Sequence, residues 1–285
     1  MILVTGATGN VGSAVLAELA DKPVTVRAFV RDPARLTVRA PNIEVFQGDF
    51  ANEADVRRAL DGVEAAFLAS NFSPSMVDLQ SRFIALAKIA HVPRLVHLSG
   101  VGADKQICCA RLLRWLGKLE ATAADSGMTV TNLRATFFMQ NLLQFASTIK
   151  QEGIIAGPFR SGRWTFVDAR DVGAVGAAAL LNSQHDGATY VVTGSEALSY
   201  QEVAERLGNK LGKQVRYLDI TANEARGRLQ ATGSSPVMIE ATLELWDACA
   251  SNLINVAPTN VVHELTGRAP RSLEDFVADY RSRFA

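Results

Sequence analysis

A glycine-rich turn near the start of the chain, between an apolar strand and an apparent helix, restricts the fold more than any other feature. Residues Ile2–Val4 predict a short strand, Val11–Leu19 predict a helix, and the turn between them reads TGATGNVG. Gly6 allows a tight turn, Gly9 allows the backbone to approach a pyrophosphate, and Gly12 allows the helix to pack closely on the sheet. Free N–H groups at such a helix N-terminus attract phosphates. A dinucleotide is therefore expected at Gly6, Thr8, Gly9, Asn10, Val11 and Gly12.

Strand and helix patterns alternate along the first half of the chain. After the first strand, further strands are predicted at Val24–Val30, Ile43–Gln47, Ala65–Ala69, Arg94–Leu98 and Thr129–Arg134. Helices are predicted to begin at Asp55 and to cover Val77–Ala90 and Leu112–Asp125. This alternation is typical of an α/β fold, a Rossmann-type doubly wound parallel sheet with helices on both faces. Ligands of such sheets bind at the carboxyl ends of the strands, so the residues that follow each strand are site candidates.

Beyond residue 135 the pattern loosens, and a smaller C-terminal substrate lobe is expected. The predicted helices there are Phe138–Ile149, Asp171–Leu181 and Tyr200–Leu211, and the predicted strands are Trp164–Val167, Tyr190–Thr193 and Val215–Asp219. We expect a dinucleotide-binding core over 1–150 and a mixed substrate-binding lobe over 151–285, with segments that return to the core. The small residues Ala174–Ala179 predict close packing of their helix on the core or on a partner. Asp168 is expected to organise the start of that helix.

Composition and charge exclude several classes of protein. The 285 residues are 48% hydrophobic, enough for a full core, and 29 basic residues balance 29 acidic ones. No electrostatic feature favours nucleic acid or a membrane surface as a partner. The four histidines are scattered, Cys108 and Cys109 are adjacent, and Cys249 is alone, so neither a metal site nor a structural disulfide is expected. No signal peptide or membrane span is visible, which predicts a cytoplasmic protein of undetermined oligomeric state.

The end of the second strand predicts which dinucleotide binds. NAD-binding proteins typically place an acidic residue there, whereas this chain has Arg31 in the sequence FVRDP. A guanidinium fits a ribose 2′-phosphate through charge-assisted hydrogen bonds, and Arg35 offers a possible second clamp. The alternative is a solvated Arg31 that pairs with Asp32. NADP(H) is therefore expected in preference to NAD(H).

Residues after the third and fourth strands complete the expected cofactor site. Asp49 is placed to accept a hydrogen bond from the adenine amino group, and Phe50 is placed to pack nearby. Asp49 could instead cap the helix that follows. Residues Ala69, Ser70 and Asn71 would run beside the cofactor.

Several segments together resemble the NmrA-like branch of the atypical short-chain dehydrogenase/reductases. These segments are TGATGNVG, FVRDP, QGDF, HLSG, SGMTVTNLRATFFMQNLL, FVDARDVGAVGAAAL and VTGSEALSYQEVAERLGNKLGKQVRY, and they span essentially the whole chain. Within that branch the chain looks most like NADPH-dependent quinone reductases and flavin-free azoreductases. The resemblance implies a cytoplasmic oxidoreductase that uses NADP(H) and needs neither flavin nor metal.

The usual proton donor of the superfamily is missing. Ordinary members use the tyrosine of Tyr-x-x-x-Lys, but none of the four tyrosines here has a lysine four residues later. Relatives often carry a histidine four residues before the glutamate that Glu120 matches, and this chain has Leu116 there. Lys118 is the nearest candidate donor, with a solvated lysine as the alternative. Ser99 matches the superfamily's serine and could contact substrate or nicotinamide, or could only hold a loop.

The segment after the sixth strand is expected to pass the nicotinamide. Thr136 and the Phe137 backbone are the expected cofactor contacts. Phe137, Phe138 and Trp164 are expected to wall a pocket for a flat aromatic substrate, although such residues often belong simply to the core.

Loss of the tyrosine favours acceptors that manage without a dedicated acid. Hydride addition to a quinone gives a resonance-stabilised phenolate, which water can protonate, and a hydroxylated azo dye can react as its quinone-hydrazone tautomer. We therefore expect an NADPH-dependent reductase of azo, quinone or quinone-imine acceptors. Two alternatives remain open. One is a non-catalytic redox sensor of the NmrA type, and the other is a reductase of phenylpropanoid type with Lys118 as proton donor.

Overall fold

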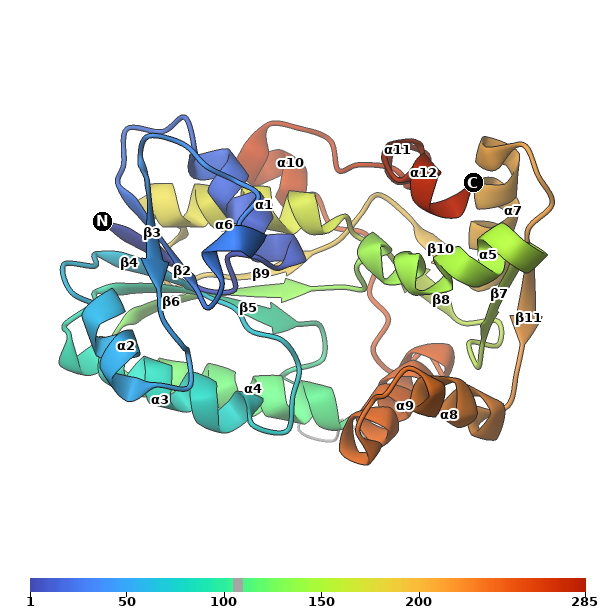
Figure 1. Cartoon of the computed structure of the whole chain (residues 1–285), viewed down its shortest axis with the longest axis horizontal. Coiled ribbons are helices and arrows are strands. Elements are labelled where there is room, and N and C mark those ends of the chain that lie inside the picture. The colour runs from blue at the N-terminus through green and yellow to red at the C-terminus, as the bar shows by residue number, and fades with distance from the viewer. Residues whose placement is uncertain (105–109) are drawn as a thin grey trace.

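Seven parallel strands form the central sheet, in the spatial order β3-β2-β1-β4-β5-β6-β9 (Figure 1). The computed structural model describes residues 1–104 and 110–285, so Cys108 and Cys109 lie outside the described residues. Central strands such as β4 are buried along their whole length, as expected of a sheet covered on both faces. The strands are β1 Ile2–Val4, β2 Val26–Val30, β3 Ile43–Gln47, β4 Ala65–Leu68, β5 Arg94–Gly100, β6 Thr129–Ala135 and β9 Thr189–Val192.

Helices cover both faces of this sheet. One face carries α1 (Asn10–Leu19), α6 (Ala169–Leu181) and α10 (Val261–Thr266). The other carries α2 (Glu53–Ala59), α3 (Met76–Ile89) and α4 (Arg111–Ala124). The predicted Rossmann-type α/β fold is thus confirmed. None of the helices within the described ranges is both long and apolar enough to cross a membrane.

The small-residue helix α6 packs directly on α1. A Cβ placed on Gly173 would lie 2.4 Å from the Cβ of Ala14, and one placed on Gly176 would lie 3.3 Å from the Val15 side chain. A contact this close leaves no room for even a methyl group. Of the two alternatives for this segment, close packing on the core is the one that the structure shows.

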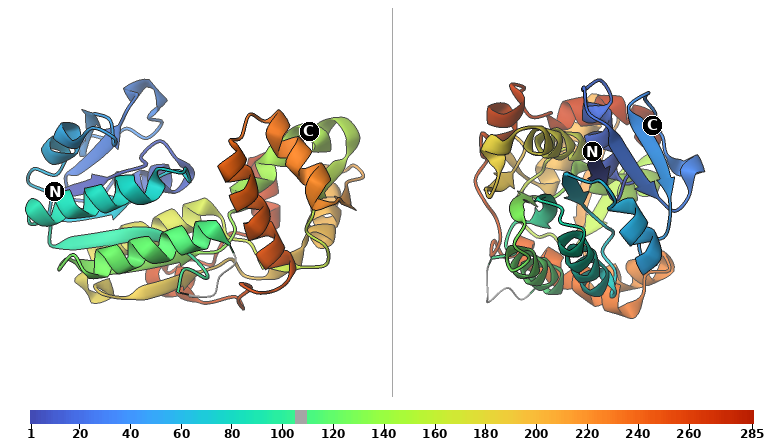
Figure 2. Two further views of the ribbon diagram at one scale, coloured as in Figure 1. Left: turned by 90° about the horizontal axis from the view of Figure 1, so that it is seen from below. Right: turned by 90° about the vertical axis from the view of Figure 1, so that its left-hand side faces the viewer.

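A second group of elements lies beyond the carboxyl ends of β5 and β6, as the left view in Figure 2 shows. Its buried residues join those of the α2–α3–α4 layer in one continuous hydrophobic cluster. It contains two pairs of strands, β8 with β10 (antiparallel) and β7 with β11 (parallel). Its elements are α5 Ala146–Glu152, β7 Ile154–Gly157, β8 Arg163–Thr165, β10 Ala197–Ser199, α7 Tyr200–Leu211, β11 Arg216–Asp219, α8 Ala222–Ala231, α9 Pro236–Ala250, α11 Leu273–Asp279 and α12 Arg281–Phe284.

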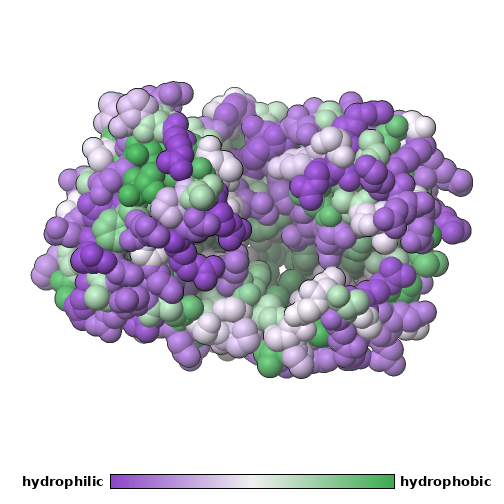
Figure 3. All heavy atoms as spheres, viewed as in Figure 1, coloured by the Kyte–Doolittle hydropathy of each residue, from purple (hydrophilic) through white to green (hydrophobic). Residues whose placement is uncertain are grey.

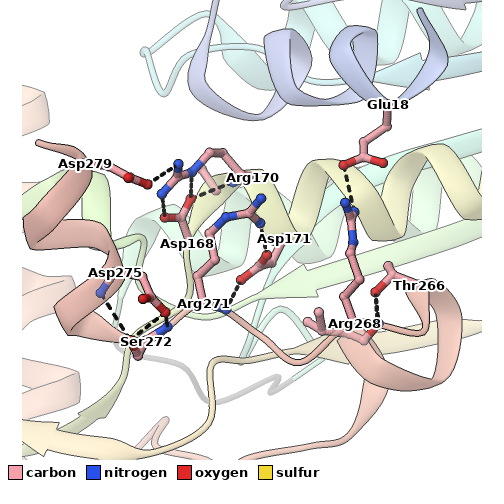
Figure 4. Close-up of polar contacts among 12 residues, drawn as sticks. Glu18, Asp168, Arg170, Asp171, Thr266, Arg268, Arg271, Ser272, Asp275 and Asp279 are labelled. Atoms are coloured by element: carbon pink, nitrogen blue, oxygen red, sulfur yellow. Dashed lines mark hydrogen bonds and ion pairs between the residues drawn. The ribbon is translucent and has the colours of Figure 1, made fainter. Parts of the chain in front are cut away.

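Ion pairs hold the C-terminal segment against α1 and α6 (Figure 4). Arg268 pairs with Glu18 of α1 at 2.7 Å. Arg271 pairs with Asp171 of α6, whose carboxylate also accepts the Arg271 backbone N–H at 2.7 Å. The Asp171 side chain is almost fully buried, so this pair lies inside the structure.

The Asp168 carboxylate is fully buried and links three parts of the chain. It caps α6 at the backbone N–H of Arg170, pairs with the Arg170 guanidinium at 2.7 Å, and accepts from Gln140 Nε2 at 2.8 Å. Arg170 also reaches Asp279 of α11 at 2.6 Å. Burial alone would raise the pKa of Asp168, but the hydrogen bonds from Arg170 and Gln140 outweigh it and hold the pKa below its usual range. The expected role of Asp168 at the helix start is confirmed.

Two parts of the sequence prediction differ from the structure. The helix predicted over Phe138–Ile149 is instead a 3₁₀ helix, Met139–Phe145, followed by α5. Its start is displaced because Phe138 forms a bridge with Val167, and Met139 N–H donates to the Val167 carbonyl at 2.8 Å. Tertiary hydrogen bonds have overridden the local pattern. The short strands β7 and β10 lie outside the predicted elements.

Replacing Gly173 with alanine tests the contact between α1 and α6. Gly173→Ala should reduce the free energy of unfolding by about 1–3 kcal/mol, because the added methyl overpacks the contact. Gly227→Ala is the matched control, since Gly227 is also helical but has nothing within 4 Å of the position that an added Cβ would take. That variant should be unchanged or gain up to about 1 kcal/mol. Urea unfolding measures both, and equal effects would contradict the close packing of these two helices.

Removing the charge of Asp168 tests its structural role. Asp168→Asn keeps the shape but loses the charge-assisted bonds, so the free energy of unfolding should fall by about 1.5–3 kcal/mol at pH 7. Asp279→Asn, at the exposed end of the same arginine, should cost less than about 1 kcal/mol. Because the folded-state pKa is lowered, the advantage of the wild type is complete above the unfolded-state value, about 3.9, and should shrink below it. Urea unfolding at several pH values measures this, and a pH-independent difference would contradict it.

Candidate active site

The glycine-rich loop after β1 is shaped by contacts between backbone atoms. Gly6 has φ +60°, in the left-handed region that favours glycine. A Cβ on Gly12 would lie 2.2 Å from the Gly6 carbonyl oxygen, and one on Gly6 would lie 2.9 Å from that of Ala69. Gly9, Thr8 and Asn10 are exposed. Helix α1 follows with no side-chain cap and no acidic residue in its first turn, so its N-terminal amides are available to an anion.

The end of β2 presents Arg31 and Arg35 to solvent. Among the described residues neither guanidinium has a carboxylate partner, and Asp32 instead caps a 3₁₀ helix, Pro33–Arg35, by accepting from Ala34 N–H at 3.0 Å. The alternative pairing of Arg31 with Asp32 is therefore absent. Two positive charges are left for an anion at this strand end.

The segment after β3 has a polar and an aromatic part. Asn52, not Asp49, caps α2, so the alternative role of Asp49 as helix cap is not observed. Asp49 is exposed, and its backbone N–H donates to the Asp55 carboxylate at 2.9 Å. Phe50 stacks on Phe83 of α3, with ring centroids 5.4 Å apart. Half-buried Phe50 therefore rests on the core. Asp49 Oδ1 accepts from the Ala51 N–H at 2.8 Å, so Oδ2 is the oxygen left for a ligand.

A buried glutamine that the sequence analysis missed holds the residues after β4. Gln80 is 2% exposed, and its Nε2 donates to Ser70 Oγ at 2.8 Å. Its Oε1 has no hydrogen-bond partner among the residues that the structure describes. Ala69 is fixed from the other side, because its N–H donates to Thr5 Oγ1 at 2.9 Å. Asn71 is exposed. A polar residue at helical spacing among the apolar residues of α3 was the signal available in the sequence.

Ser99 takes part in an ionic network at the end of β5. Its hydroxyl donates to Glu120 Oε1 at 2.5 Å, and Glu120 forms a two-bond pair with Arg134, with distances of 3.0 and 2.6 Å. Arg134 also pairs with Asp104 at 2.7 Å. The hydrogen bond to Glu120 is the main reason that the pKa of Arg134 is raised. The Ser99 proton is therefore committed to Glu120, and only the oxygen lone pairs remain for a ligand.

Lys118 lies on the exposed side of α4. Its neighbours Leu116 and Leu119 are buried, whereas Lys118 is exposed and is not among the described residues that line the pocket below. Its assignment as a proton donor stays a prediction.

A largely apolar pocket opens where β5 and β6 end. Its volume is about 120 Å³, and it is open to solvent. The hollow between the two halves of the molecule in Figure 3 has apolar residues along it. One wall comes from the central sheet and the segment after β6, and the other from α9 and the residues after it. The described lining residues are Phe72, Ser99, Gly100, Val101, Leu113, Leu116, Ala135, Thr136, Phe137, Phe138, Asn141, Trp164, Thr165, Leu245, Cys249, Ile254, Asn255 and Val256.

The three aromatic residues predicted to contact substrate all line this pocket, but they are not equivalent. Phe137 and Phe138 are half-buried. Trp164 is 1% exposed and meets Phe137 edge-on at 4.2 Å between centroids. Behind it lies an aromatic cluster that includes Phe159 and Tyr200, stacked at 3.7 Å. Trp164 therefore supports the wall from behind, whereas the half-buried rings of Phe137 and Phe138 are accessible to a ligand in the pocket.

Comparison with known proteins gives consistent matches over the full length. The NmrA-like family profile matches residues 1–277. A protein named NAD(P)H azoreductase from Xenophilus azovorans is 33% identical over 287 residues, which is 100% of this chain and 99% of the relative. A protein named (4-alkanoyl-5-oxo-2,5-dihydrofuran-3-yl)methyl phosphate reductase from Streptomyces griseus is 38% identical over 286 residues, 100% of this chain and 99% of the relative.

A solved structure agrees with these sequence relatives. The NADPH-dependent quinone oxidoreductase QOR2 of Escherichia coli, complexed with NADPH, superposes with a TM-score of 0.88. It is 26% identical, and the match covers 99% of this chain and 100% of that chain. The chain therefore belongs to the NmrA-like family.

Proposed function

We propose that this protein is an NADPH-dependent reductase that transfers hydride to a conjugated, electron-poor acceptor such as a quinone, a quinone-imine or an azo dye. One observation carries the proposal. An apolar pocket walled by Phe137 and Phe138 opens at the ends of β5 and β6, on the same edge of the sheet as the glycine-rich loop. The azoreductase and quinone oxidoreductase relatives support the same class of acceptor.

The residues at the strand ends fit NADP(H). The pyrophosphate would lie on the loop Gly6–Gly12, where Gly9 is exposed and the α1 amides are uncapped. Arg31, with Arg35 beside it, would hold the 2′-phosphate. Asp49 and Phe50 would meet the adenine, and Ala69, Ser70 and Asn71 would line the path between the two ends of the cofactor. NADPH, when bound, supplies hydride from its nicotinamide.

The nicotinamide end would lie against the segment that follows β6. Thr136 and the Phe137 backbone would position it, together with Ser99. Because the Ser99 proton is committed to Glu120, Ser99 would accept a hydrogen bond, for example from the carboxamide. Phe137 and Phe138 would stack the acceptor, with Trp164 behind them. In this proposal residues 1–150 form the cofactor core, and residues 151–285 supply the opposite wall and segments that return to the core.

None of the tyrosines lines the described pocket, which favours acceptors that need no strong acid. Tyr200 is buried in the aromatic cluster, and burial raises its pKa. Tyr217 donates to Asp219 and accepts from the Phe159 backbone. A simple ketone would leave a strongly basic alkoxide with no tyrosine to protonate it. A quinone or a hydrazone leaves a delocalised anion that water can protonate. We place the enzyme in the cytoplasm, and we assign it neither flavin nor metal.

Turnover of NADPH with a panel of acceptors tests this function. The panel comprises benzoquinones, naphthoquinones, hydroxylated azo dyes and a 4-acyl butenolide, with a simple cyclohexanone as negative control. We expect NADPH oxidation with at least one conjugated class and none with the ketone. One quinone or butenolide should be consumed per NADPH, whereas an azo dye cleaved to two amines should consume two NADPH. Tight NADPH binding without consumption of any acceptor would contradict the reductase and leave the dinucleotide sensor.

Replacing Arg31 tests the choice of cofactor. Arg31→Ala should weaken NADPH binding about 10- to 100-fold, since a charge-assisted hydrogen bond is worth about 1.5–3 kcal/mol, while NADH binding stays unchanged. Arg39→Ala removes a nearby positive charge whose guanidinium instead donates to the Pro33 carbonyl, and it should have little effect. Fluorescence titration gives the dissociation constants. Equal losses for both cofactors would contradict a contact with the 2′-phosphate.

A further inference from the structure

We propose that Asn141 is the hydrogen-bond donor that binds the carbonyl oxygen of the acceptor and stabilises the negative charge that develops there. This inference rests on the proposed function and assigns that function a residue of the pocket. It depends on where the proton of each polar side chain that lines the pocket is directed.

The hydroxyl protons of the pocket are already committed to protein acceptors. Ser99 donates to Glu120 at 2.5 Å. Thr165 donates to the Val256 carbonyl at 2.6 Å. Thr136 donates to a main-chain carbonyl of β9 at 3.3 Å. Each hydroxyl can still accept a hydrogen bond, but none has a proton left for a ligand.

The amides of Asn255 and Asn141 differ in the same respect. Asn255 Nδ2 donates to the Arg163 carbonyl at 2.5 Å and to Asn252 Oδ1 at 2.6 Å, so both of its protons are used. The side chain of Asn141 is exposed in the pocket and has no partner anywhere in the part of the chain that the structure describes. The indole N–H of Trp164 also lacks a partner, but it is buried and has no exposed surface to offer.

Hydrogen bonds hold the turn that carries Asn141, whereas the Asn141 side-chain amide takes no part in them. The neighbouring Gln140 is buried, and its amide bonds to Asp168 at 2.8 Å and to the Ala169 N–H at 2.9 Å. The Asn141 backbone N–H donates to the Phe138 carbonyl at 3.0 Å, and its own carbonyl accepts from Gln144 at 2.8 Å. A fixed backbone with one free donor is the arrangement that favours stabilisation of charge without reorganisation.

The position of Asn141 fits the chemistry of the acceptor. It follows Phe137 and Phe138 by three or four residues and lines the same pocket, so a flat ring stacked on these side chains can direct one oxygen toward the amide. When a quinone accepts hydride from the cofactor, it gains two electrons and one hydrogen, and the negative charge resides on oxygen. A proton from water then completes the hydroquinone. The Asn141 N–H would bind that oxygen more strongly as its charge grows, which lowers the barrier.

Steady-state kinetics of Asn141→Ala with a quinone is the first test. We expect kcat to fall about tenfold or more. This is less than the roughly 100-fold or greater loss when one oxyanion donor is removed elsewhere, because the charge here is delocalised. The dissociation constant for NADPH should be unchanged. Gln144→Ala is the matched control, because it loosens the same turn but keeps the amide, and it should stay near wild type. If the wild type reduces no acceptor, the proposed function itself fails; if Asn141→Ala matches an active wild type, only this inference fails.

Asn141→Asp separates a donor from a merely structural residue. A carboxylate cannot donate and repels the developing charge, so activity should be lost at neutral pH. As the pH falls toward the carboxyl's ordinary value, about 4, the protonated acid regains a donor and activity should rise relative to wild type. A flat ratio of variant to wild type across this range would overturn the proposal.

Binding of a coloured phenol gives a readout that does not depend on turnover. With NADP⁺ present, 4-nitrophenol bound to the wild type should ionise at a lower pH than when bound to Asn141→Ala, because the amide stabilises the phenolate. Absorbance of the yellow phenolate follows this ionisation. The same ionisation midpoint in both proteins would overturn the inference, even if the variant were slower for other reasons.

Discussion

The buried carboxylate of Asp168 is the interaction on which most of this structure depends. It begins α6, fixes Gln140 in the turn beside the pocket and, through Arg170, reaches Asp279 near the C-terminus. A charge in this position is stable only because the Arg170 guanidinium, the Arg170 backbone N–H and the Gln140 amide all donate to it. The pocket, the helix that packs on α1 and the last part of the chain are therefore positioned by one group.

The polar groups of the pocket are as constrained as its walls. Ser99, Thr165 and Asn255 donate their hydrogen bonds to other protein groups and not to a ligand. The pocket is therefore largely apolar in character although polar residues line it. Such a space favours flat neutral molecules and disfavours ligands that need many hydrogen bonds. The ionic network of Glu120 and Arg134 lies just outside it and keeps the Ser99 proton directed away.

Much of the fold and the shape of the glycine-rich turn could be predicted from the sequence, because both depend on local patterns. Alternating strands and helices indicate the sheet. The glycines of TGATGNVG indicate a turn in which backbone segments approach so closely that no side chain fits between them. The predictions for the residues after the strands rested on the same rule, that ligands meet the carboxyl ends. The choice between the alternatives for Arg31 and Asp49 could not be made from the sequence. Only the structure shows that Asp32 caps the 3₁₀ helix Pro33–Arg35 and that Asn52 caps α2.

The remaining features depend on long-range contacts, which the sequence does not reveal. The spacing of Gln80 among the apolar residues of α3 indicates that it is buried, but only the structure shows that Ser70 is its partner. Glu120 gains its role only from Ser99 and Arg134, which arrive from two different strands. Lys118 was singled out by its position in the sequence, yet the turn of α4 directs it to solvent. The sequence alone does not show which charged residue is paired in the structure and which faces solvent. The helix face on which the residue lies and the order of the strands determine this.

The two walls of the pocket come from regions of the chain that are more than a hundred residues apart. Selection for a particular acceptor and selection for the cofactor therefore act on different segments. The wall formed by β5, β6 and the following turn lies at the carboxyl edge of the sheet, where we propose that the cofactor binds. The opposite wall, with Leu245 and Cys249, belongs to α9, which joins α4 through the pair of Arg111 and Glu244 at 2.9 Å. Substitutions on one face of α9 can therefore reshape the space for the acceptor and leave the redox half of the site untouched. Enzymes built on this plan can diverge in substrate while they keep one source of electrons.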